Sequence, residues 1–144
     1  NIYAIGAGVI DAESLGQNAR AAYITRCIAE IKSMLKLLNF NTNMIYSLGG
    51  VGDLILSCSS SKSRNYKFGY NFVTKNKMLT NFKTIEGLNS CLNIKKNKKI
   101  KINKLPIINS IIKIINGSQP KKVAPNRDSP PRHLQRFRQL CRAD

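Results

Sequence analysis

The chain has 144 residues and a formal net charge of +17, from 24 Lys and Arg against 7 Asp and Glu. This length suits one domain with a modest core. The sequence shows no signal-peptide pattern and no run of eighteen apolar residues, so we expect a cytoplasmic protein rather than a secreted or membrane-inserted one. The cysteines show no C-x-x-C spacing, so we expect no metal site, and Cys27 and Cys58 fall in apolar patterns typical of buried free thiols.

The first forty residues predict two helices. The chain enters an apolar pattern directly at Ile2, and the segment 6–8 reads Gly-Ala-Gly. That segment lacks the preceding strand and the third glycine of a dinucleotide loop, so we expect it to allow close helix packing. From 11 to 38 the apolar residues recur at three- and four-residue steps, with an N-cap expected within 16–18 and an end at Asn39. We expect Arg20 to make a salt bridge rather than bind a ligand.

A short helix capped by residues 41–43 is expected to run to Leu48 and to lead into a glycine-rich stretch. The sequence there is G-G-V-G-D-L-I-L-S-C, with Asp53 after the last glycine. One interpretation makes Asp53 a helix N-cap. The other is a substrate pocket, in which Asp53 takes hydroxyl groups while Ser63, Arg64 and Asn65 offer donors to an anion. Composition alone predicts a strand over 51–58, and a loop is expected over 57–61.

Lysine and asparagine dominate the next part of the chain. We expect a connection over 70–83, and the basic residues are densest over 95–104. Residues 1–60 carry four basic and four acidic residues, so the excess charge lies entirely after them. Such a run can attract nucleic acid or anionic lipid, but no aromatic residue interleaves with it to stack a base. An alternative explanation of the basic run is coding bias, because an AT-rich genome favours the use of Lys, Asn and Ile together.

The last predicted helix of the domain opens at Leu105-Pro106-Ile107 and ends at Asn116-Gly117, with isoleucines nearly all round it. From Ser118 the composition changes to proline and arginine without isoleucine. We expect disorder at least to Pro131 and a short basic helix over 134–140. The change suggests a shifted reading frame or a foreign junction near residues 121–122. His133, the single histidine, lies in this tail and is given no catalytic role.

Two separated motifs carry a resemblance to a known family. The run G-V-G-D-L-I-L-S-C-S-S-S-K-S-R-N-Y-K-F-G and the opening N-I-Y-A-I-G-A-G with N-A-R-A-A-Y-I-T-R-C-I-A-E resemble bacterial NAD(P)-dependent glycerol-3-phosphate dehydrogenase. The likeness runs from Asn1 to about Gly117, with weaker matches at 85–87 and 105–107. It implies an all-α substrate domain of the 6-phosphogluconate dehydrogenase C-terminal-like class over 1–117 and a helix over 51–58. The family would continue with a further helix after residue 122, so the Pro/Arg-rich tail over 118–144, which we expect to be disordered, departs from the resemblance.

The resemblance also implies a division of roles. Asp53, Ser63, Arg64 and Asn65 would bind glycerol 3-phosphate or dihydroxyacetone phosphate, and Arg64 and Glu86 would contact NAD or NADP. Thr84 departs from the family pattern, so Glu86 alone is carried over from its element. The family's catalytic lysine would directly precede Asn1, and the nucleotide-binding half would precede that.

We therefore expect that this chain is inactive by itself and acts together with a nucleotide-binding half. A homodimer is left open as a further assembly. The parent reaction interconverts sn-glycerol 3-phosphate and dihydroxyacetone phosphate and feeds glycerophospholipid synthesis. Two other interpretations remain open. One is a folded, non-catalytic remnant, and the other is a basic polyanion-binding protein that uses residues 95–104 and the tail. Specific nucleic-acid recognition is not expected.

Overall fold

The computed structural model describes residues 1–74, 85–97, 100–117 and 132–142, and within these ranges its regular elements are all helices, without a strand. This confirms the predicted all-α class. The α-helices are α1 (Ile2–Ala12), α2 (Gly16–Leu37), α3 (Asp53–Ser59), α4 (Arg64–Thr74), α5 (Glu86–Lys96), α6 (Pro106–Gly117) and α7 (Arg132–Leu140). Shorter turns are η1 (Thr42–Tyr46), the π-helical η2 (Leu48–Gly52) and η4 (Ile102–Lys104).

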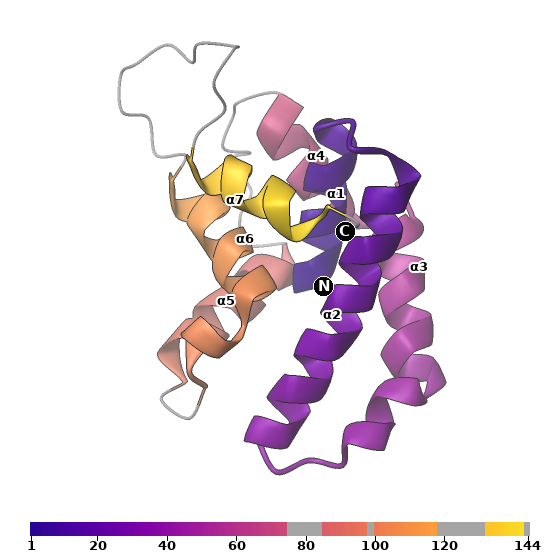
Figure 1. Ribbon diagram of the computed structural model, residues 1–144, viewed down its shortest axis with the longest axis vertical. Helices are drawn as coiled ribbons and strands as arrows, with labels where there is room; N and C mark the ends of the chain where they lie inside the picture. The colour runs from indigo at the N-terminus through magenta and orange to yellow at the C-terminus, as the bar shows by residue number, and fades with distance from the viewer. Residues whose placement is uncertain (75–84, 98–99, 118–131, 143–144) are drawn as a thin grey trace.

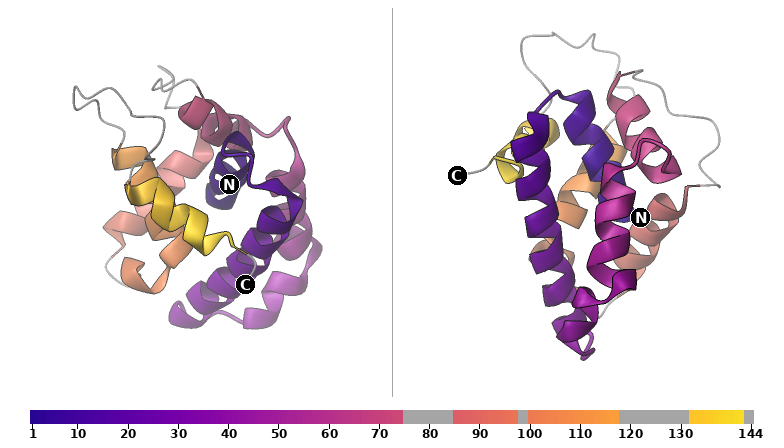
Figure 2. Two further views of the ribbon diagram at one scale, coloured as in Figure 1. Left: turned by 45° about the horizontal axis from the view of Figure 1, so that its top comes forward. Right: turned by 90° about the vertical axis from the view of Figure 1, so that its right-hand side faces the viewer.

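Helix α1 is the centre of the fold, with α2 and α3 on one side and α5 and α6 on the other (Figures 1 and 2). Every residue from Ile2 to Ile10 is buried, and α1 contacts each helix from α2 to α6. Its closest neighbour is α4, because a side chain added at Gly8 would overlap the backbone oxygen of Tyr66, and one added at Gly69 would overlap that of Ile5. The predicted close packing at the Gly-Ala-Gly segment is confirmed.

The first two helices end in the same way. At the end of α2, Asn39 has a left-handed φ of 60°, and the Phe40 N–H donates to the Leu35 carbonyl at 2.9 Å, which satisfies an otherwise free carbonyl. This confirms Asn39 as the end of the helix. At the end of α1, Ser14 takes the left-handed conformation (φ 52°). This turn is so tight that α2 already begins at Gly16, so the N-cap expected within 16–18 is wrong.

The stretch from 48 to 59 is helical, as the resemblance implied, and the strand suggested by its composition is wrong. A π-helical turn over the glycines passes directly into α3, and only Leu54 and Cys58 of α3 are buried. Asp53 is the first residue of α3, and Gly52 occupies the N-cap position where Asp53 was expected. The loop begins at Ser60 rather than at 57, since α3 continues to Ser59.

Two further boundaries can be compared with the prediction. Helix α4 continues to Thr74, into the connection expected over 70–83, most of which lies outside the described residues. Helix α6 begins at Pro106 as predicted, because proline suits the first helical position, where its missing N–H costs nothing. The next two N–H groups, of Ile107 and Ile108, donate to the carboxylate of Glu30 from α2 at 2.6 and 2.9 Å.

Helix α7 confirms the short basic helix expected over 134–140, and it packs on the core. Phe137 is 1% exposed, and its ring centroid lies 5.8 Å from that of Tyr23 on α2. Arg26 donates to the carbonyls of Leu140 and Arg142 at 3.0 and 2.7 Å, and so satisfies carbonyls at the end of α7. The predicted disorder up to Pro131 and the junction at 121–122 lie outside the described residues.

The expectations about buried thiols and about membrane-spanning segments can be compared with the described part of the chain. All four cysteines are buried and free. Burial raises the pKa of the Cys91 thiol to about 11 and that of the Cys141 thiol to about 12, so both are poor nucleophiles at neutral pH. None of the described helices is long and apolar enough to cross a bilayer.

Candidate functional site

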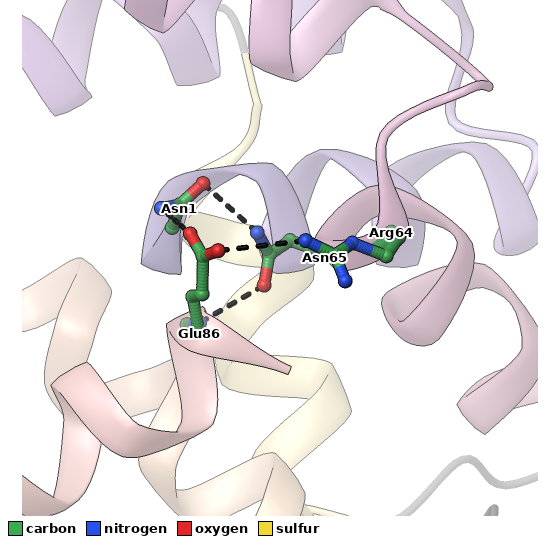
Figure 3. Close-up of polar contacts among 5 residues, drawn as sticks. Asn1, Arg64, Asn65 and Glu86 are labelled. Carbon is green, nitrogen blue, oxygen red and sulfur yellow. Dashed lines mark hydrogen bonds and ion pairs between the residues drawn. The ribbon is translucent and has the colours of Figure 1, made fainter. Parts of the chain in front are cut away.

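Three of the five predicted ligand residues, Arg64, Asn65 and Glu86, come together where the N-terminal ends of α1, α4 and α5 meet (Figure 3). A chain of hydrogen bonds starts at the Gly87 backbone N–H, which donates to Asn65 Oδ1 at 2.9 Å. Asn65 Nδ2 donates to Asn1 Oδ1 at 2.9 Å, and Asn1 Nδ2 donates to Glu86 Oε2 at 2.8 Å. Arg64 Nη2 reaches the other oxygen, Glu86 Oε1, at 3.5 Å. We call these five residues the amide cluster.

Asn65 lies at the centre of the amide cluster and is 6% exposed. Both ends of its side-chain amide are used within the protein, which is what a buried polar group requires. Gly87 makes this geometry accessible, because a Cβ there would lie 2.9 Å from Asn65 Oδ1 and 2.9 Å from the Asn1 carbonyl oxygen. Asn65 is therefore held rigidly between three helices.

Arg64 and Glu86 form the open side of the amide cluster. Their side chains are 69% and 61% exposed, and an ion pair of this kind contributes only about 0–1 kcal/mol. Arg64 is also the first residue of α4, an end of a helix at which free N–H groups and the helix dipole favour an anion. The ion pair can therefore open at small cost, and the guanidinium can then pair with another anion.

Ser63 and Asp53 lie outside the amide cluster, and neither hydrogen-bonds to it among the described residues. Ser63 immediately precedes α4, and its Oγ accepts the Tyr66 N–H at 3.4 Å, so it serves the helix end. Asp53 is exposed at the start of α3. Burial raises the pKa of the Cys58 thiol to about 12, while the N-terminal ammonium acts to lower it and Asp53 to raise it further.

A second polar cluster connects α4 to α1 and α2. The carboxylate of Asp11 on α1 pairs with Arg20 of α2 and accepts the hydroxyl of Tyr66 on α4. Arg20 also donates to the Tyr66 hydroxyl at 3.4 Å. The predicted salt bridge of Arg20 is confirmed, and its partner is Asp11. This cluster ties the first turn of α4, which carries Arg64 and Asn65, to the buried helix α1.

The sequence prediction did not include Asn1 or Gly87 in the site. Gly87 stood within the weak match at 85–87, but a glycine there gave no sign of a backbone N–H used by a side chain. Asn1 was noted only as the residue that follows the expected lysine. Its contact with Asn65 joins residues 64 positions apart, which no local pattern indicates.

The chain is similar to known proteins over most of its length. A family described as NAD-dependent glycerol-3-phosphate dehydrogenase C-terminus matches residues 1–126. Similar curated proteins are the glycerol-3-phosphate dehydrogenases [NAD(P)+] of Synechococcus sp. (34% identity, 82% of this chain, 40% of the relative) and Mycoplasma mobile (38%, 80% and 35%). That of Haemophilus influenzae is 49% identical over 48% of this chain and 21% of its own length. The chain thus spans less than half of these relatives. No solved structure matches it.

Proposed function

Because the chain belongs to the family of the NAD-dependent glycerol-3-phosphate dehydrogenase C-terminus, we propose that it is the substrate-binding part of an oxidoreductase. The reaction would interconvert sn-glycerol 3-phosphate and dihydroxyacetone phosphate with NAD or NADP, in the cytoplasm. The observation that carries the proposal is the position of Arg64. Its exposed guanidinium lies at a helix N-terminus, weakly paired with Glu86 at 3.5 Å.

Arg64 is the proposed phosphate-binding residue. A guanidinium offers planar paired donors that match the oxygens of a phosphate, and charge-assisted hydrogen bonds of this kind are the strong ones. Ser63 stands next to it at the same helix end and retains a hydroxyl proton to donate. Asn65, whose amide is largely used within the amide cluster, would act mainly by fixing the first turn of α4.

Asp53 is proposed to orient the substrate's hydroxyl groups. A carboxylate accepts hydrogen bonds from alcohols, and Asp53 is exposed at the start of α3. In the family that the chain resembles, the lysine of acid–base catalysis would directly precede the equivalent of Asn1, and Asp53 would bind the glycerol moiety beside it. When bound, the nicotinamide accepts or supplies the hydride.

Glu86 and Arg64 are the proposed cofactor contacts of this chain. A carboxylate suits hydroxyl groups of a ribose, and an arginine suits the phosphates. The described residues contain no strand and therefore no dinucleotide fold, so most of the cofactor site would belong to a nucleotide-binding half. A second copy of the chain, in a homodimer, is also proposed as a partner and is compatible with this arrangement.

The first test measures binding of sn-glycerol 3-phosphate to this chain by calorimetry and by NMR shifts of residues 63–66. Arg64→Ala should weaken binding about 10- to 100-fold, because one or two charge-assisted hydrogen bonds are lost. Lys67→Ala is the matched control: Lys67 is also exposed and cationic on α4, and its removal should change affinity less than about twofold by long-range charge alone. Equal binding by wild type and Arg64→Ala would contradict the proposed site.

A second measurement distinguishes a competent half-enzyme from a non-catalytic remnant. Hydride transfer from reduced nicotinamide to dihydroxyacetone phosphate is assayed with this chain alone and with a relative's nucleotide-binding half that ends in its lysine. Activity only in the mixture supports the proposal. Silence in both, with a folded chain by circular dichroism, supports the remnant. The polyanion-binding alternative stays a prediction, since the described lysines of the basic run, Lys95, Lys96, Lys101 and Lys104, are simply exposed.

A further inference from the structure

The geometry of the amide cluster points to an additional role for Asn1: we infer that it is a positioning residue that orients Asn65 and Glu86. The inference rests on the proposed function, because it concerns the same site. Asn1 occupies the N-cap position of α1, yet its side chain makes no capping hydrogen bond. Asparagine is among the preferred N-cap residues, so the side chain has been diverted from its usual local use.

The direction of the hydrogen bonds in the cluster is set by a group that cannot reverse. The Gly87 backbone N–H can only donate, so the atom of Asn65 that it meets at 2.9 Å is the amide oxygen. The other end of Asn65 must then donate, and it meets Asn1 Oδ1 at 2.9 Å. The NH2 group of Asn1 is left to donate, and it meets Glu86 Oε2 at 2.8 Å. Each amide is thereby fixed in one orientation.

The hydrogen-bonded ring that results begins and ends on the first turn of α5. It leaves Gly87 through its N–H, passes through Asn65 and Asn1, and returns to the carboxylate of Glu86 (Figure 3). Neighbouring hydrogen bonds of such a chain polarise and strengthen one another. Asn1 is the link that closes the ring, because it supplies both an acceptor to Asn65 and a donor to Glu86.

The two carboxylate oxygens of Glu86 have different roles in ligand binding. One carboxylate oxygen is held by Asn1 at 2.8 Å, while the other faces Arg64 at 3.5 Å. When a phosphate draws Arg64 away, Glu86 keeps its position because Asn1 still holds it. Without Asn1, the carboxylate is free to follow Arg64 and to compete with the phosphate for the guanidinium.

Asn1→Asp separates the two functions of the Asn1 amide. Aspartate is as good an N-cap as asparagine, so α1 should remain intact, and its carboxylate still accepts from Asn65. It no longer donates to Glu86 and instead places a like charge beside it. Asn1→Ala removes both hydrogen bonds. Asn18→Asp is the control for the change in charge, because Asn18 is an exposed asparagine at the start of α2.

The first readout needs no ligand. In Asn1→Ala, exchange of the Asn65 side-chain NH2 and the Gly87 backbone N–H with solvent, measured by NMR, should be at least 10-fold faster than in the wild type. In Asn1→Asp the Asn65 signal should stay protected, and in Asn18→Asp both should be unchanged. Unchanged protection in Asn1→Ala would overturn the inference, whatever the chain binds.

The second readout is the affinity for sn-glycerol 3-phosphate. We expect Asn1→Ala to weaken it about threefold and Asn1→Asp about fivefold, with a melting temperature for Asn1→Asp within about 2 °C of the wild type. Wild-type affinity in both variants would overturn the inference. Absence of binding by the wild type would overturn the proposed function instead, and the exchange measurement would still decide the role of Asn1.

Discussion

Two glutamates of this chain differ in what their carboxylates are used for: Glu30, in the middle of α2, reaches the N-terminus of α6, and Glu86 is the first residue of α5. Glu30 is 5% exposed. It accepts the N–H groups of Ile107 and Ile108 at the start of α6 and the hydroxyl of Tyr3 at 3.3 Å. The Glu86 side chain is 61% exposed, accepts one amide from Asn1 at 2.8 Å, and meets Arg64 only at 3.5 Å.

The same chemical group serves structure at Glu30, and at Glu86 we propose that it serves ligand binding. At α6 the donors come from the backbone and the site is closed to water, so the carboxylate is committed to the fold. At α5 one oxygen is fixed and the other faces an exposed cation across a weak contact. A fixed oxygen beside an exchangeable partner is the arrangement that a ligand can use without disturbing the fold.

The largest expected effect that separates the two acids is on stability. Glu30→Ala leaves two backbone N–H groups of α6 buried without partners, which should lower the free energy of unfolding by about 3 kcal/mol. Glu86→Ala should lower it by less than about 1 kcal/mol, since its contacts are exposed. Urea unfolding of both variants measures the contrast, and equal losses would contradict it.

A smaller effect concerns pH. Burial raises the pKa of Glu30 above its usual value of 4.5, although the N–H groups of Ile108 and Ile107 act to lower it. A raised folded pKa means that the folded state binds the proton more tightly than the unfolded state does. The stability from this group is therefore fully present below pH 4.5 and is lost as the pH rises through the folded pKa. The loss is about 1.4 kcal/mol for every tenfold difference in proton affinity between the two states.

Glu30→Gln isolates this titration, because glutamine keeps the shape and cannot ionise. We expect the stability of the wild type relative to Glu30→Gln to fall as the pH rises from 4 towards 7, as measured by urea midpoints at each pH. The other acids titrate in both proteins and cancel in the difference. A difference that grows with pH would show that the backbone donors outweigh burial.

The smallest expected effect sharpens the comparison at Glu86. Glu86→Gln keeps an oxygen to accept from Asn1 but removes the charge that competes for Arg64. Stability should change by no more than about 0.5 kcal/mol, while the affinity for sn-glycerol 3-phosphate should rise about two- to threefold, as isothermal calorimetry would detect. A loss of affinity would indicate that Glu86 itself contacts the substrate.

Local patterns in the sequence were sufficient for much of the fold. The spacing of apolar residues predicted α2, Pro106 marked the start of α6, and Asn39 marked the end of α2. Composition misled at Val51–Cys58, because a short apolar run is compatible with either a strand or a helix. Only the family resemblance indicated that helical structure would form there.

The site was predicted in part, and the missing residues share a physical reason. Arg64, Asn65 and Glu86 were selected from motifs, and the structure brings them together. Asn1 and Glu30 act through partners 64 and 77 residues away, which no pattern of spacing can indicate. The packing of α7 against the core was not predicted, for a different reason. The arginines of this segment dominate its composition, and its apolar contact depends on Phe137 and, just after the helix, Cys141, both of which are buried.

The burial of residues 2–10 of α1 has a consequence for the nascent chain. Its closest partner, α4, begins only at residue 64. At ribosomal speeds of about 5–20 residues per second, roughly 3 to 10 seconds separate the synthesis of the two helices. During that interval, of the helices that contact α1 in the folded domain, only α2 and α3 have been made. Among residues 1–142, a chaperone that binds short apolar segments would therefore meet residues 2–10 before it meets the rest of the core that these residues form.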